Sequence, residues 1–323
     1  MQERLSRKKK LLWAFGAALA AAIISLYVPE FWPGAKISAH EHYRAGGGMD
    51  SYLKAARFAN IKKAVFLPTD WPASNPAYKE NLQELLKLKK QYPDKIIAFA
   101  TAYNRDPSAA SYLEEALRNG ASGIKFIDWL ESKKYPNEAG AVDSANMYKI
   151  YEVARKYKVP LLMHIDFQKR PEWKEQFWNA ARDFPDVTFI LAHYCRAASG
   201  EVPLLELCSE TLDKFPNVFT DLSMGGGIKR YVRYFDKNPE IFRNFILRYQ
   251  DRILWGTDLE IRPDKPKTSL TVARRMWLDF LILQKKYYLN PFHGGFKLHR
   301  GFNLPREVLE KIYWENPKKI LKL

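Results

Sequence analysis

Short apolar strands alternate with helices along the chain from residue 36 to its end. Eight such strands are expected, at 36–42, 63–67, 96–100, 123–127, 159–164, 187–193, 218–222 and 252–257. Strands that are apolar along their whole length are typical of a parallel sheet buried on both faces. Eight strand–helix repeats over about 290 residues predict an α/β fold, a closed (β/α)8 TIM barrel formed by one domain, 36–323.

A doubly wound open sheet is the main alternative to the barrel. That fold calls for a glycine-rich phosphate loop directly after its first strand. Gly46, Gly47 and Gly48 follow the first strand, but they lack the G-x-G-x-x-G spacing. Histidines occupy the positions where the phosphate loop would begin, so the pattern favours the barrel.

The N-terminus reads as a membrane anchor. Residues 1–10 form a basic tail with five cations and one acid, and residues 11–29 contain no charge. At about 1.5 Å per residue, such a helix is just long enough to span a bilayer core. The basic tail predicts a cytoplasmic N-terminus, with the rest of the chain on the extracytoplasmic (periplasmic) side. A cleaved signal peptide is the competing interpretation.

The anchor also predicts an orientation for the barrel. About ten residues separate the apolar stretch from the end of the first strand, where catalytic groups of a barrel sit. The beginning of that strand would therefore lie near the membrane. We expect the active site to face away from the bilayer, towards soluble substrates.

The basic composition does not indicate a nucleic-acid partner. The formal charge is +16, but lysine and arginine are scattered along helices without an aromatic–basic motif. Contact with anionic lipid or an anionic substrate would also fit this charge. Cys195 and Cys208 have neither C-x-x-C spacing nor the number expected of a disulfide scaffold, and whether they form a disulfide stays open.

Five chemically similar residues stand at predicted strand ends. His40 and His42 end the first strand, His164 the fifth and His193 the sixth, while Asp258 follows the eighth. Residues i and i+2 of a strand share a face, and the carboxyl ends of barrel strands converge on one mouth. Imidazoles with a carboxylate predict a divalent metal site, most simply Zn²⁺, with Mn²⁺ or Fe²⁺ as alternatives.

This arrangement resembles the amidohydrolase superfamily, and within it the amidohydrolase-2 branch of metal-dependent hydrolases and nonoxidative decarboxylases. The segments that carry the likeness span most of the chain after residue 35. They are AHEH (39–42), GGGMDSYLKAA (46–56), IKKAVFLP (61–68), GIKF (123–126), LLMHID (161–166), ILAH (190–193), LWGTD (254–258) and LPREVLEKIYWENPKKIL (304–321).

The resemblance implies roles for these residues. His40, His42, His164 and Asp258 would hold one divalent metal with a water at an open position. The metal would lower the pKa of that water towards about 7. Asp258 would also take a proton from the water, and His193 would act as general acid or base near the substrate carbonyl.

Two cations are further candidates. Lys125 lies in the fourth strand, where superfamily members with two metals place a bridging carboxylated lysine; one ion is favoured over two. An uncarboxylated Lys125 could instead bind an anionic substrate. Arg44 could clamp a carboxylate or phosphate, or form a surface ion pair.

Several other polar residues near the motifs are weaker candidates. Asp166 and Glu260 flank ligand strands and could support the ligands. A structural role is expected for His293 and His299, and a buried thiol rather than a nucleophile for Cys195, which Arg196 follows.

Three functions of different class are consistent with the sequence. The first is a metal-dependent hydrolase acting on an ester, lactone, amide or similar bond of a small molecule. The second is a metal-dependent decarboxylase of an unsaturated or aromatic acid. A membrane-anchored scaffold without activity is the third, and the complete ligand set argues against it. The hydrolase is preferred as the broader expectation of the resemblance; an oligomer is compatible with each.

Overall fold

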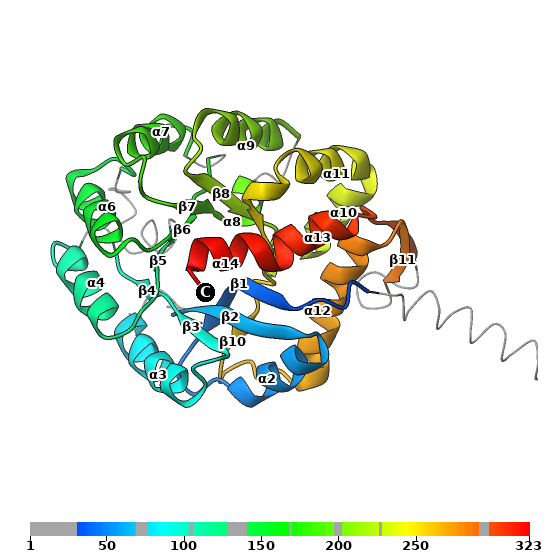
Figure 1. The fold of residues 1–323 in the computed structure, drawn as a ribbon, viewed down its shortest axis with the longest axis horizontal. Helices are drawn as coiled ribbons and strands as arrows, with labels where there is room; N and C mark the ends of the chain where they lie inside the picture. Colours follow the sequence, from blue (N-terminus) through cyan, green and yellow to red (C-terminus); the bar gives the residue numbers. More distant parts are fainter. Residues whose placement is uncertain are drawn as a thin grey trace, which may run out of the picture.

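The computed structural model describes residues 31–68, 77–103, 106–127, 141–167, 170–196, 202–225, 228–290 and 297–323. Its strands, apart from one antiparallel pair near the C-terminus, form a ring surrounded by helices (Figure 1). The strands are β1 (Lys36–Tyr43), β2 (Ile61–Pro68), β3 (Ile96–Ala98), β4 (Ala100–Thr101), β5 (Ile124–Ile127), β6 (Leu161–His164), β7 (Phe189–Leu191), β8 (Val218–Asp221), β9 (Ile253–Leu254), β10 (Glu260–Ile261), β11 (Tyr287–Asn290) and β12 (Lys297–Arg300).

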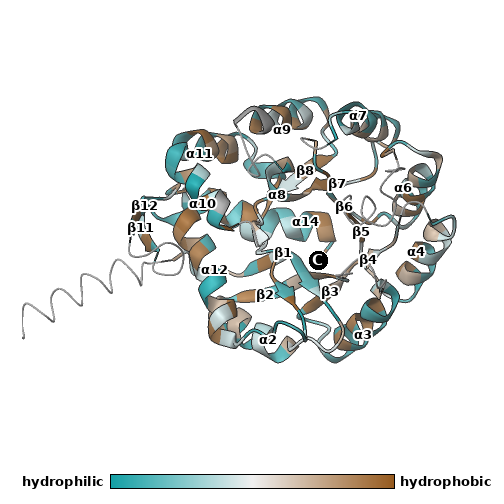
Figure 2. Cartoon of the chain, turned by 180° about the vertical axis from the view of Figure 1, so that it is seen from behind, coloured by the Kyte–Doolittle hydropathy of each residue, from teal (hydrophilic) through white to brown (hydrophobic). Residues whose placement is uncertain are grey.

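Helices follow most of the ring strands, and most of them pack outside the ring. They are α2 (Met49–Phe58), α3 (Tyr78–Gln91), α4 (Ala109–Arg118), α6 (Ala145–Tyr157), α7 (Trp173–Asp183), α8 (Ala192–Cys195), α9 (Val202–Lys214), α10 (Ile228–Lys237), α11 (Pro239–Arg248), η3 (Gln250–Arg252), α12 (Ser269–Gln284), α13 (Arg306–Glu310), η4 (Lys311–Glu315) and α14 (Asn316–Leu321). Hydrophilic and hydrophobic patches alternate on these helices, as amphipathic packing requires (Figure 2).

All neighbouring strands in the ring run parallel, in the orders β10-β1-β2-β3 and β4-β5-β6-β7-β8-β9. The amide of Phe99, between β3 and β4, donates to the Phe66 carbonyl and so joins the two sheets. The Ala39 amide donates to the Trp255 carbonyl at 2.8 Å and joins β1 to the end of β9. These contacts produce an α/β fold consistent with the predicted TIM barrel.

A glycine allows this closure. A Cβ atom at Gly256 would lie 2.7 Å from the backbone nitrogen of His40, so a side chain there would separate the first and last strands. Inside the ring, apolar side chains from the strands meet Ile320 of α14, which crosses the barrel at the end where the strands begin (Figure 1). We call this the closed end, and the opposite end the mouth.

The structure differs from the expected elements in three places. The strand expected at 187–193 is β7, and it ends at Leu191 instead of reaching residue 193. Helix α10 lies between the seventh and eighth strands, where no helix was expected. The sequence pattern predicts a helix over about 269–288 and a loop over 290–303. The helix ends instead at Gln284, and β11 and β12 pair antiparallel after it. This hairpin lies outside the ring and carries little of the apolar alternation that marks the other strands.

Among the helices described, none combines the length and the apolar character needed to cross a bilayer. The predicted basic tail (1–10) and anchor (11–29) lie outside the described residues. The first described residues pack against the barrel, where the ring of Phe31 contacts Trp277 and Phe280 and that of Trp32 stacks on Tyr313. The chain therefore enters the barrel at the closed end, where β1 begins.

Candidate active site

His40 and His42 lie side by side at the mouth, as expected for residues i and i+2 of one strand. Their Nε2 atoms are 3.3 Å apart. His40 is buried, and His42 is partly exposed towards the mouth. Their strand is pinned between β2 and β10, which fixes the direction of both imidazoles.

Asp258 reaches these histidines from the segment after β9. Its Oδ1 lies 3.0 Å from His42 Nε2 and 3.5 Å from His40 Nε2. The Asp258 backbone has a left-handed φ of 54°, and its amide donates to the His40 carbonyl at 2.8 Å. Gly225 makes room for the carboxylate, because a Cβ there would lie 2.0 Å from Asp258 Oδ2.

These three residues fit a divalent metal. Ligand bonds of about 2.0–2.1 Å in a tetrahedral site place ligand atoms about 3.3 Å apart. The three Nε2 and Oδ1 separations, 3.0, 3.3 and 3.5 Å, bracket that distance. Two imidazole nitrogens and a carboxylate oxygen are also a donor set suited to Zn²⁺, Mn²⁺ or Fe²⁺. We call His40, His42 and Asp258 the ligand triad.

Asp221, at the end of β8, orients His40 from behind. Its Oδ2 lies 2.8 Å from His40 Nδ1. A carboxylate accepts, so Nδ1 carries the proton and the Nε2 lone pair faces the triad. Carboxylates commonly support metal-bound histidines in this way. Asp221 was not anticipated from the sequence, although its place at the end of an apolar strand could have signalled it.

Ser223 is a second residue not anticipated from the sequence. Its Oγ lies 3.1 Å from His40 Nδ1, 2.9 Å from His193 Nδ1 and 2.5 Å from Asp221 Oδ1. Ser223 therefore joins both histidines to the same carboxylate. No sequence motif marks it, because this contact depends on the turn after β8.

Glu41 holds the triad together from the other face of β1. Its buried carboxylate accepts from Ser38 Oγ and Thr257 Oγ1, each at 2.5 Å, and from the Leu259 amide at 2.9 Å. Thr257 and Leu259 flank Asp258, so Glu41 ties the loop that carries Asp258 to the strand that carries the histidines. Burial raises the pKa of Glu41 to about 7, against these hydrogen bonds.

His193 sits on an uncommon turn rather than on the predicted strand. Four successive residues, 193–196, have left-handed φ values of 53–63°. Each such non-glycine residue costs about 1–2 kcal/mol. The Asp221 Oδ1 accepts from the His193 amide at 3.1 Å, and Thr220 Oγ1 accepts from the Cys195 amide at 3.2 Å. These bonds stabilise the turn and direct the imidazole into the barrel.

The orientation of His193 suits proton transfer. Its Nδ1 lies 3.0 Å from the Ser223 carbonyl oxygen, which can only accept, so Nδ1 carries the proton. The Nε2 lone pair then faces the mouth, 3.7 Å from Asp258 Oδ2. This nitrogen is beside the triad and available to exchange a proton there.

His164 lies near His193 but outside the triad. The ring centres of His164 and His193 are 5.1 Å apart. Arg196 approaches His164 Nε2 with Nη1 at 2.9 Å and donates from Nη2 to Asp166 Oδ2 at 2.8 Å. The guanidinium thus stands where His164 would face a metal, and Asp166 supports it.

Lys125 faces the interior of the barrel, a point that strand alternation alone did not settle. It is 1% exposed, and its Nζ lies 3.4 Å from His40 Nε2. Arg44 is further out and forms an ion pair with Asp264 at 3.6 Å. Lys125 is therefore beside the triad, whereas Arg44 is engaged at the rim.

The electrostatics of the cluster favour neutral imidazoles and ionised carboxylates. Burial and the charge of Lys125 together lower the pKa of His40 to about 4, although the Asp221 and Asp258 carboxylates oppose this shift. Burial also lowers the pKa of His193 to about 4. Although burial opposes it, the neighbouring imidazoles hold the pKa of Asp258 well below its ordinary value. These are the protonation states that metal binding requires.

The weaker candidates lie at the edges of the site. Cys195 forms a disulfide with Cys208 of α9 and is not a free nucleophile. Glu260 pairs with Arg262 at 2.8 Å. His299 bonds to Asp236 and stacks on Tyr288 in the hairpin, in keeping with its expected structural role. His293 lies outside the described residues.

Several solved structures of other proteins have a similar fold. The structure is similar to a probable 2-pyrone-4,6-dicarboxylic acid hydrolase from Acinetobacter baumannii with citric acid bound, at 13% identity and a TM-score of 0.60 over 90% of this chain and 100% of that one. It is also similar to 4-oxalomesaconate hydratase from Rhodopseudomonas palustris. The two are 14% identical, with a TM-score of 0.56 over 89% of this chain and 95% of that one. A third similar structure is 5-carboxyvanillate decarboxylase from Novosphingobium aromaticivorans, complexed with manganese and a nitrobenzoic acid. It is 13% identical, with a TM-score of 0.54 over 90% of this chain and 97% of that one.

The sequence itself places the chain in a family. A search of curated proteins finds no match. Residues 30–323, which include the whole barrel, match the family model described as amidohydrolase, of the amidohydrolase-2 type. Within the described residues, His40, His42 and Asp258 form one of two groups with metal-ligand spacing; the other is His40, His193 and Asp221. The chain is an enzyme that belongs to the amidohydrolase-2 family.

Proposed function

We propose that the protein is a metal-dependent hydrolase that uses one divalent ion, most simply Zn²⁺, on an ester, lactone, amide or similar bond. The observation that carries this proposal is the spacing of the ligand triad, 3.0–3.5 Å between donor atoms. His40, His42 and Asp258 would hold the ion. His164 would join them once Arg196 no longer occupies its Nε2 atom. Mn²⁺ and Fe²⁺ are the alternative ions.

The chain's own groups account for the proton movements. A divalent ion in such a site supplies a water of lowered pKa. Asp258 Oδ2, which is free of the short contacts that Oδ1 makes, would accept a proton from that water. His193 Nε2, 3.7 Å from this oxygen, would take up the proton and pass it to the leaving group. The Ser223 carbonyl holds the His193 ring through Nδ1, and Asp221 holds the His193 backbone amide.

The cations at the mouth support an anionic substrate. Lys125 is buried beside His40, and Arg196 is only 21% exposed beside His164. A substrate carboxylate would gain a charge-assisted hydrogen bond from either group. The three similar proteins are named for carboxylic acids or their derivatives, which supports the same substrate class. A carboxylated Lys125 that bridges two ions is the alternative role for this residue.

Decarboxylation of an aromatic or unsaturated acid is the second candidate. The same cations favour it, because they would bind the carboxylate that leaves as CO₂. The two reactions give different products from one substrate panel of carboxylates, lactones and esters in ¹⁸O-labelled water. Hydrolysis incorporates ¹⁸O into the product acid. Release of CO₂ without that label would replace the hydrolase proposal with the decarboxylase.

Metal content tests the site independently of any substrate. We expect about one divalent ion per purified chain, and loss of most of it in His40→Ala and Asp258→Asn. Asp213→Asn, at a surface ion pair with Arg248, is the matched control and should retain the ion. A protein without metal whose properties do not change in His40→Ala would instead support the scaffold.

We also propose that residues 11–29 anchor the barrel to a membrane from the extracytoplasmic side. The uncharged stretch after a basic tail supports this topology. The Cys195–Cys208 disulfide supports it too, because disulfides persist mainly in oxidising compartments. A C-terminal reporter that works only in the cytoplasm should stay silent. Reporter activity would contradict the topology, and recovery of a chain lacking its first residues would favour a cleaved signal peptide.

A further inference from the structure

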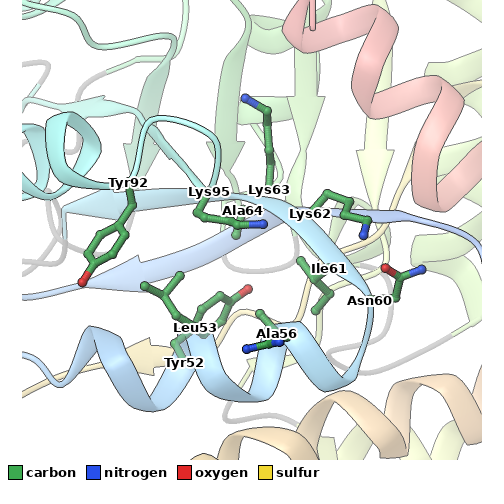
Figure 3. Close-up of a pocket in the computed structure, with 11 residues that line it drawn as sticks. Tyr52, Leu53, Ala56, Asn60, Ile61, Lys62, Lys63, Ala64, Tyr92 and Lys95 are labelled. Carbon is green, nitrogen blue, oxygen red and sulfur yellow. The ribbon is translucent and has the colours of Figure 1, made fainter.

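We propose that the closed end of the barrel binds an anionic phospholipid surface, with a lipid headgroup seated in a basic pocket between α2 and β2. This inference goes beyond the metal chemistry and concerns the opposite end of the molecule. The pocket has a volume of about 500 Å³. Figure 3 shows it between the helix and the strand, with Leu53, Ala56 and Ile61 in its floor.

Four cations line this pocket without being neutralised. They are Arg57, Lys62, Lys63 and Lys95. Among the residues that the structure describes, none of the four forms an ion pair, and no acidic residue lines the pocket. Burial lowers the pKa of nearby Lys89, and the charge of Lys63 lowers it further, so repulsion between cations is felt here. An anion would relieve it.

The apolar floor and one exposed aromatic side chain indicate a lipid rather than a free anion. Phe58 ends helix α2 next to Arg57 and is 85% exposed. Such an aromatic residue beside cations is the combination that seats amphipathic helices in the headgroup region. A free phosphate would use the cations but leave Phe58 in water.

A second basic pocket, of about 330 Å³, lies at the same end of the barrel. It is lined by Arg155, Lys158, Lys319 and Lys322, with Asp186 as its one acid. The starts of β6 and β7 and helix α14 frame it. The closed end thus presents cations on two sides, which complements the negative potential of a membrane with anionic lipids.

The chain enters the barrel at the closed end, beside the first basic pocket. Asn60, which lines the first pocket, donates from Nδ2 to the Pro33 carbonyl at 2.6 Å, and its own carbonyl accepts from the Lys36 amide. Pro33 follows the uncharged stretch 11–29 by only a few residues. If that stretch spans a bilayer, the closed end is the face of the barrel that is turned towards the lipid, and anionic headgroups decide whether the pocket and Phe58 dock on it.

The test uses the full chain in lipid nanodiscs, with Phe58→Cys carrying an environment-sensitive dye. The native cysteines form a disulfide, so the dye labels residue 58 alone. In phosphatidylcholine discs containing phosphatidylglycerol we expect a blue shift that is absent in phosphatidylcholine alone. Each cation lost near such a surface weakens attraction about fivefold. Arg57→Glu/Lys62→Glu should therefore abolish the shift.

Lys229→Glu/Lys265→Glu is the matched control, since these two exposed lysines lie at the mouth side and the charge change is the same. It should keep the shift. An equal shift in phosphatidylcholine discs, an equal loss in the control, or suppression of the shift by millimolar inorganic phosphate would each overturn the proposal. Whether the full chain stays bound to phosphatidylcholine discs tests the membrane anchor. The dye at residue 58 tests whether the closed end contacts anionic lipid. The two proposals can therefore fail independently.

Discussion

At the scale of single residues, the site depends on groups that do not touch a ligand. Asp221 fixes the tautomer of His40, bonds the backbone of His193 and accepts from Ser223. Glu41 accepts hydrogen bonds from Thr257 and Leu259 and so fixes the segment that carries Asp258. Two buried carboxylates therefore hold the ligand triad in shape from opposite sides.

Asp221→Ala should weaken metal binding by about 10–100-fold, the usual effect of removing a carboxylate behind a histidine ligand. His40 would lose the partner that keeps its Nε2 lone pair towards the triad. The measurement is competition with a chelator of known affinity. Asp213→Asn at the surface serves as the control. Equal affinities in the wild type and Asp221→Ala would contradict this role.

Lys36 gives a pH-dependent prediction. Burial lowers its pKa to about 8, from 10.5 in the unfolded chain. Between these values the unfolded chain binds the extra proton, so the unfolding free energy must rise with pH. From pH 8 to 10 the gain is about 2 kcal/mol. Urea unfolding of the full chain in detergent should show this gain over Lys36→Met, and the exposed Lys54→Met should follow the wild type.

At the scale of elements, backbone conformation places the ligands as much as the strands do. The left-handed turn at 193–196 aims His193. Asp258 also has a left-handed backbone, and its carboxylate fits only because residue 225 is a glycine. Both occur where a strand ends and the regular hydrogen bonding stops. Small backbone changes there should affect the site more than the fold.

Gly225→Ala tests this. The added Cβ would meet Asp258 Oδ2 at 2.0 Å, and the φ of 46° is unfavourable for alanine. We expect metal affinity to fall at least tenfold while the circular dichroism spectrum stays native. Gly48→Ala is the matched control, because nothing lies within 4 Å of its Cβ position. A Gly225→Ala protein with unchanged affinity would refute the packing argument.

The elements also show what the sequence could and could not predict. Continuous apolar runs predicted the ring strands, and i, i+2 geometry predicted the pairing of His40 and His42. The left-handed turn at 193–196 was not predictable, because its stability comes from Asp221 and Thr220 on the neighbouring strand. The hairpin was missed since its strands are half exposed and lack apolar alternation. The position of Arg196 against His164 likewise depends on that turn.

At the scale of the whole molecule, the barrel has two ends with different chemistry. The mouth gathers histidines and carboxylates from β1, β6, β8 and the segment after β9. The closed end gathers two basic pockets and the start of the described chain. The fold thus separates the proposed reaction from the proposed membrane contact by the length of the strands.

Metal binding should stabilise the whole barrel, because the triad joins its first and last strands. At a free metal concentration of 100 times the dissociation constant, the gain is about 2.7 kcal/mol. Chelation should lower the thermal unfolding midpoint of the wild type accordingly and leave Asp258→Asn almost unaffected. Identical chelator effects on both proteins would show that the ion binds elsewhere.

The hydrogen bond from Thr257 to Glu41 links residues 216 positions apart, and the ligands beside them are just as distant along the chain. A ribosome has thus made most of the protein before His40 and His42 can meet Asp258. Any nascent or truncated chain that stops earlier has no complete triad to load. If export precedes folding, the ion has to be acquired beyond the membrane, from the compartment in which the last strand joins the first.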